Sequence, residues 1–96
     1  MSDTKAMGKF FETYRIKAGL TLAAAAEILD IGGADILARY EAGKTLIPLN
    51  EVFSMANIYN IPPDRVVQMF YDLSFERAQK QARESDSDSH LIKSER

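Results

Sequence analysis

The sequence predicts an all-α domain built from five short helices. Apolar residues recur at spacings of three and four along most of the chain, and glycine or proline interrupts this pattern at four points. No segment alternates apolar and polar residues as a half-buried strand would. Hydrophobic residues make up 46% of the 96 residues and charged residues 27%, which is usual for one globular domain.

The first predicted helix covers residues 4–18. Its apolar stripe consists of Met7, Phe11, Tyr14 and Ala18. Gly19 follows, where a helix commonly ends on a left-handed residue, and Thr21 is the predicted N-cap of a second helix over residues 22–29. Four successive alanines in that helix predict close packing against a neighbouring helix.

The third helix is expected to follow a turn at Gly32 and Gly33 and to end at Gly43. Its first residue is Ala34 or Asp35, since the two glycines leave the start open. The side chains expected to be buried are Leu37, Tyr40 and, less clearly from the pattern, Ile36.

The fourth helix is expected to begin near Pro48, and two prolines at 62 and 63 separate it from the fifth. The apolar stripe of the fourth consists of Val52, Met55, Ala56 and Tyr59. The apolar residues of the fifth are Val66, Val67, Met69 and Phe70. Helical character is expected to continue to about residue 82, and the polar residues from 84 onward are expected to be disordered. We therefore divide the chain into a domain over residues 1–73 and a helical extension with a polar tail over residues 74–96.

Composition excludes several classes of protein. The chain has no cysteine, which rules out disulfides and thiolate metal sites, and its only histidine, His90, falls in the polar tail. We therefore expect no catalytic residues, no metal site and no cofactor. The first residues have no apolar region typical of a secretory signal, and no apolar run is long enough for a membrane span, so we expect a cytoplasmic protein without membrane contact.

Charge argues against a strongly basic surface. The net charge is −2, and residues 1–70 carry seven basic and eight acidic side chains, a balance of −1. Nucleic-acid-binding domains are usually basic, so only the local placement of charges could favour such a partner.

Four segments nevertheless resemble one family. They are residues 15–21 (RIKAGLT), residues 26–31 (AEILDI), residues 38–44 (ARYEAGK) and residues 47–61 (IPLNEVFSMANIYNI). Their order and sequence resemble the Cro and phage-repressor type of helix-turn-helix regulators, the XRE family, over about residues 10–70. The resemblance implies a phage-repressor-like fold in which the third helix enters the major groove of double-stranded DNA.

Site residues follow from this resemblance by position. The base-facing positions that it implies are Gly32, Gly33, Ala34, Asp35 and Ala38. The phosphate contacts that it implies are Thr21, Leu22, Arg39, Lys44 and Thr45. It also implies a structural ion pair between Arg15 and Glu41. Family members commonly dimerise through the fifth helix, so a homodimer is expected, with its interface at Val67, Phe70, Tyr71 and Leu73.

The recognition segment departs from the family pattern. Leu22 stands where the family usually has a DNA-contacting glutamine, and the third helix opens with no residue that could donate a bidentate pair to guanine or adenine. Two interpretations remain open. In the first, the protein is a sequence-specific regulator, a repressor by analogy, that reads DNA mostly through backbone contacts and DNA shape. In the second, the smooth third helix binds another regulatory protein, as an anti-repressor or co-regulator would.

Overall fold

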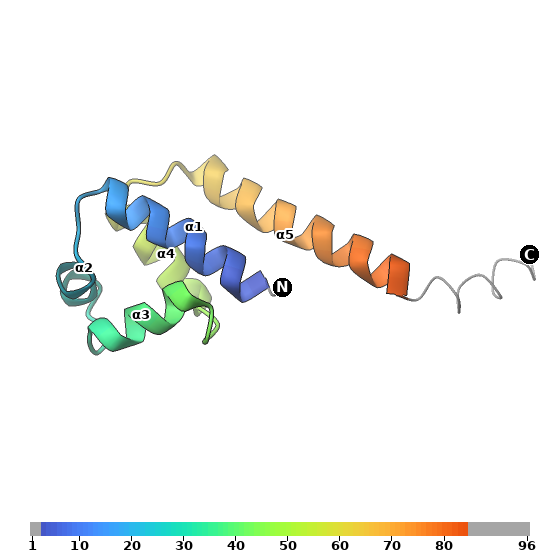
Figure 1. Cartoon of the computed structure of the whole chain (residues 1–96). Helices are drawn as coiled ribbons and strands as arrows, with labels where there is room; N and C mark the ends of the chain where they lie inside the picture. The colour runs from blue at the N-terminus through green and yellow to red at the C-terminus, as the bar shows by residue number, and fades with distance from the viewer. Residues whose placement is uncertain (1–2, 85–96) are drawn as a thin grey trace, which may run out of the picture.

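The structure is a computed structural model that describes residues 3–84 (Figure 1). The chain forms five helices in order: α1 (Asp3–Lys17), α2 (Leu22–Leu29), α3 (Ala34–Ala42), α4 (Leu49–Ile58) and α5 (Pro63–Glu84). Within the described residues there is no strand, so the predicted all-α, five-helix class is confirmed. The polar tail that was predicted to be disordered lies, beyond Glu84, outside the part of the chain that the structure describes.

Left-handed residues end α1 and α3 at the two glycines that the sequence indicated, and α4 at a residue that was not predicted. Gly19 and Gly43 have φ angles of 78° and 77°, and Asn60 takes the same role after α4 with φ 58°. In each case the next residue donates its N–H back into the last turn; Lys44 N–H, for example, reaches the carbonyl of Arg39 at 3.0 Å. These closures make the connections short and turn each helix sharply away from the one before.

The core contains buried side chains from all five helices. The largest side chains with no exposed surface are Phe11 of α1, Leu37 of α3, and Val52 and Met55 of α4. At Gly8 the backbone of α1 touches the end of α3, since a Cβ on Gly8 would overlap the carbonyl oxygens of Tyr40 and Glu41. A glycine inside α1 therefore sets how closely these two helices approach.

Two connecting segments contribute to the core although they lack helical periodicity. Ile47 before α4 and Ile61 before α5 are 8% and 5% exposed. The expectation that Ala18 would belong to the apolar stripe of α1 is wrong, because α1 ends at Lys17 and Ala18 is exposed in the turn.

Helix α5 has two distinct halves. Val66 and Met69 in its first turns are buried and close one side of the core against α1. Beyond them the helix extends past the other four helices, which gives the molecule its long axis of 58 Å against 25 and 19 Å (Figure 1). Within residues 3–84, every helix falls short of the length or apolarity that crossing a bilayer requires.

Candidate nucleic-acid interface

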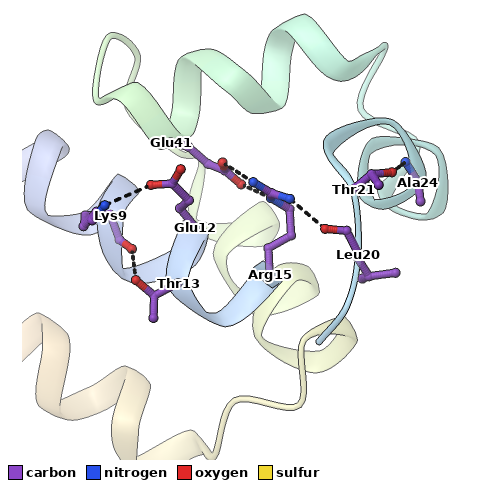
Figure 2. Close-up of polar contacts among 8 residues, drawn as sticks. All are labelled: Lys9, Glu12, Thr13, Arg15, Leu20, Thr21, Ala24 and Glu41. Atoms are coloured by element: carbon purple, nitrogen blue, oxygen red, sulfur yellow. Dashed lines mark hydrogen bonds and ion pairs between the residues drawn. The ribbon is translucent and has the colours of Figure 1, made fainter. Parts of the chain in front are cut away.

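Thr21 starts α2 as the predicted N-cap. Its backbone is extended (φ −77°, ψ 165°), and its hydroxyl accepts a hydrogen bond from the N–H of Ala24 at 3.0 Å (Figure 2). The first N–H groups of a helix have no partner inside it, so those of Leu22 and Ala23 remain available at this end. The side chain of Leu22 is half-buried and packs against the core, so this position offers a backbone donor rather than a polar side chain.

The turn between α2 and α3 uses backbone conformations that favour glycine. Asp30 ends α2 in the left-handed region (φ 56°, ψ 50°), and Gly32 and Gly33 follow with φ angles of 105° and 144°. A Cβ on Gly33 would also lie 2.9 Å from a carboxylate oxygen of Asp35. The double glycine therefore fixes where α3 begins and leaves the entry to that helix free of side chains.

Helix α3 presents a narrow outward face. Leu37 and Tyr40 are buried, whereas Asp35 and Arg39, one turn apart, are exposed. Ala34 and Ala38 are half-buried; Ala34 packs against the core, and only the methyl group of Ala38 projects from the outward face. Gly33 is the N-cap of α3 and has no side chain that could accept from the first N–H groups. Asp35 lies in the first turn, where a carboxylate interacts favourably with the helix dipole.

The loop after α3 carries the second group of predicted phosphate contacts. Lys44 and Thr45 are exposed, and Leu46 beside them is 70% exposed. Buried Ile47 holds the end of this loop against the core. The candidate surface thus has a capped helix start at one side, the slim face of α3 in the middle, and a lysine-bearing loop at the other.

The predicted ion pair between Arg15 and Glu41 is present and buried (Figure 2). Arg15 Nε lies 2.6 Å from Glu41 Oε2, and a second guanidinium nitrogen lies 3.1 Å from Oε1. The third nitrogen donates to the carbonyl of Leu20 at 2.6 Å. The two side chains are 9% and 6% exposed, and the hydrogen-bonded Glu41 raises the pKa of Arg15 although burial opposes this. One guanidinium therefore joins α1, the loop that leads into α2, and the end of α3.

Tyr59 lies close to this pair and is 3% exposed. Its hydroxyl has no hydrogen-bond partner among the described residues, and burial, with a smaller effect of nearby Glu41, raises the pKa of Tyr59 to about 12. In the sequence this residue is recognisable only as part of an apolar stripe, because residue type alone does not reveal an unpaired hydroxyl.

Acidic side chains surround the α2–α3 turn, a feature that the sequence analysis missed. Glu27 and Asp30 are exposed and line a shallow depression with Gly32, Gly33 and alanines of α2. Together with Asp35 they make this side of the surface negative. Glu27 and Asp30 are three residues apart at the end of α2, and this spacing could have predicted an acidic group there from the sequence.

The four residues predicted for the dimer interface differ in exposure. Val67 and Tyr71 are 66% and 62% exposed, whereas Phe70 and Leu73 are half-buried against the domain's own core. Phe75, which was not included in that prediction, is 51% exposed and stacks on Tyr71 with ring centroids 6.3 Å apart. Apolar residues four apart along one helix were the signal for extending the surface to Phe75.

Comparison with known proteins identifies the fold. The profile of the helix-turn-helix domain family matches residues 6–68, a range that contains most of α1, all of α2 to α4, the first turns of α5 and both sides of the candidate surface. No curated protein and no solved structure matches the chain. The chain belongs to the family of DNA-binding helix-turn-helix domains, in its Cro and phage-repressor (XRE) type.

Proposed function

We propose that this protein is a transcriptional regulator, a repressor without catalytic activity, that acts in the cytoplasm and binds operator DNA as a homodimer. Helix α3 lies in the major groove of each half-site. The observation that carries the proposal is the exposed, side-chain-poor start of α3, held between the capped start of α2 and the Lys44 loop, in a chain of a DNA-binding family. The major groove of B-DNA admits one helix of this width.

Phosphate contacts come from two sides of α3. The free N–H groups of Leu22 and Ala23, with the positive end of the α2 dipole, attract one phosphate, and Thr21 keeps that helix end in place. Lys44 and Thr45 contact the backbone on the other side. These contacts set the orientation of α3 but carry no sequence information.

Base recognition is correspondingly sparse. Asp35 is the one charged side chain in the first turn of α3, and its carboxylate accepts a hydrogen bond from a cytosine amino group. The methyl group of Ala38, which does not pack on the core, suits contact with a thymine methyl. The remaining specificity comes from DNA shape and from the spacing between the two half-sites.

Selection from a random duplex library with the purified chain, followed by titration of the best duplex at several salt concentrations, tests the proposal. The expected result is enrichment of a two-fold symmetric sequence and an affinity that falls steeply with salt. Lys44→Gln should weaken binding to all duplexes alike and lower the salt slope by about one per subunit, whereas Asp35→Ala should change the preferred sequence. No enrichment and no binding at low salt by a folded protein would refute it.

Lys17→Gln is the matched control for Lys44→Gln. Lys17 ends α1 over the ring of Tyr14, with Nζ 5.1 Å from the ring centroid, beside a groove formed with Tyr59 and Arg65 rather than with α3. The Lys17→Gln substitution removes the same positive charge as Lys44→Gln, but from a different surface. Its salt slope should match that of the wild type.

A second candidate function uses the same surface for a regulatory protein instead of DNA. The observation that favours it is the group of acidic residues Glu27, Asp30 and Asp35 around the α2–α3 turn, which repels phosphate. This candidate predicts a stable complex with a second, DNA-binding regulator from the same locus, lost in Ala38→Arg and unaffected by duplex DNA. A complex that survives Ala38→Arg would exclude this surface.

A further inference from the structure

The outer side of α5 carries an apolar stripe that no other part of the described chain covers. We call the α5 stripe the set Val67, Tyr71, Phe75, Ala78 and Ala82. All five side chains are exposed, and they follow one another at spacings of four and three along one side of the helix. From Ser74 onward every side chain whose exposure is described is exposed, and Figure 1 shows this half of α5 extending beyond the other helices. An isolated helix of this length is only marginally stable in water, so we expect its exposed stripe to pack against a partner.

An apolar groove lies beside Val67, at the end of the α5 stripe that is nearest to Pro63. Phe53 of α4, Pro62 and Ile61 of the connection, and Val66 and Val67 of α5 are among its lining residues. Phe53 is 58% exposed, and it was absent from the stripe of α4 that faces the core. Val67 belongs to both features, so the groove and the stripe form one continuous apolar surface.

We propose that this surface is filled by a second copy of the chain, with the two α5 helices antiparallel and the last turns of each seated in the α4–α5 groove of the other. The inference rests on the homodimer of the proposed function and specifies its geometry. Val67 and Glu84 lie eight and nine residues from Phe75, distances of roughly 12 and 13 Å along a helix. A two-fold axis near Phe75 therefore brings the end of one α5 to the groove of its partner.

Charge and side-chain size both favour the antiparallel arrangement. Residues 63–72 carry two acidic and one basic residue, a net charge of −1, and residues 73–84 carry three basic and two acidic residues, a net charge of +1. Antiparallel copies place these opposite halves side by side and also oppose the two helix dipoles. The first half of the stripe has the large side chain of Tyr71, and the second half has Ala78 and Ala82, so large residues face small ones.

Cysteine cross-linking tests the direction of the helices, because the natural chain has no cysteine. Val67→Cys and Ala82→Cys are each placed in the full chain at an exposed position and treated with a short bis-maleimide, separately and as an equilibrated mixture. The expected result is a cross-linked dimer in the mixture and little in either variant alone, with Phe75→Cys cross-linking to itself. Efficient cross-linking of each end variant with itself would mean a parallel pair and overturn the proposal.

Sedimentation of the wild-type chain without DNA supplies the second measurement. Phe53→Glu should weaken the dimer by about tenfold or more, since it places a charge in the groove. Ile16→Glu, an equally exposed apolar residue of α1 at 60%, should leave the dimer unchanged. A monomeric wild type, or a dimer unaffected by Phe53→Glu, would refute the inference. Because no DNA is present, failure to bind DNA would leave this result standing and would count against the proposed function alone.

Discussion

Arg15→Ala should unfold much of the domain, because Arg15 holds both oxygens of a buried carboxylate. Without it Glu41, whose side chain is 6% exposed, stays buried and unpaired, and the Leu20 carbonyl loses its donor. Removing one partner of a buried pair costs about 3–5 kcal/mol. The total stability of a domain of about 80 residues is roughly 4–12 kcal/mol. At roughly 4–8 °C per kcal/mol, the melting midpoint should fall by at least about 12 °C.

Thermal and urea unfolding, followed by far-ultraviolet circular dichroism, measure this loss. A double-mutant cycle separates the pair from its surroundings. Arg15→Met and Glu41→Leu together replace the pair by apolar side chains and should destabilise the domain less than Arg15→Met alone, which gives a coupling energy of about 2–3 kcal/mol. Arg15→Lys keeps the charge but loses the planar fork that reaches Glu41 and Leu20 together, so it should fall between wild type and Arg15→Ala.

An exposed ion pair provides the control. Lys9 Nζ lies 3.5 Å from Glu12, and the two side chains are 78% and 33% exposed, so Lys9→Ala should change stability by less than about 1 kcal/mol. An Arg15→Ala midpoint that falls no further than that of this control would contradict a stabilising buried pair. So would single changes at Arg15 and Glu41 whose effects add up to that of the double variant within about 0.5 kcal/mol.

Two further predictions concern the packing of the domain. Gly8→Ala should destabilise the fold by about 1–3 kcal/mol in urea unfolding, although alanine favours helix, because its Cβ would overlap the carbonyl of Tyr40; a gain in stability would show that α1 and α3 separate easily. The pKa of Tyr59, raised by burial from 10 to about 12, means that the folded state holds the phenolic proton more tightly than the unfolded state. This stability is present below about pH 10 and is lost as the pH rises through about 12, so Tyr59→Phe should flatten the decline that urea unfolding measures between those values, and an unchanged decline would exclude Tyr59 as its cause.

Features of the sequence that act locally predicted most of the fold. Thr21 and Gly43 mark helix ends by capping rules that involve only neighbouring residues, and both act as predicted. Ile47 is buried because its loop returns to the core. Neither the spacing of apolar residues in this loop nor their helix propensity predicts that return. The same holds for Gly8, since a glycine inside a helix does not say which neighbour approaches it.

The site was predicted less completely than the fold, for a related reason. Arg15 and Glu41 are 26 residues apart in sequence, and only the resemblance to the family indicated that they would meet. Position in that family also indicated Leu22 as a DNA contact; its apolar side chain packs against the core, so the prediction concerns its backbone N–H alone. The acidic residues around the α2–α3 turn came from no family pattern, and their effect depends on the folded surface that gathers them.

In the proposed mode of DNA binding, a weak recognition helix and a rigid dimer belong together physically. With Asp35 as the one charged residue in the first turn of α3, a single domain has little to discriminate one sequence from another. Two such domains held at a fixed spacing bind the second half-site at an effective concentration near the millimolar range, so weak preferences at each half-site combine. Spacing also becomes a criterion of its own, since a duplex whose half-sites are wrongly placed engages only one domain. In the proposed complex, where base recognition is sparse, the helix that sets the distance between the two domains would therefore determine specificity as much as the helix that enters the groove.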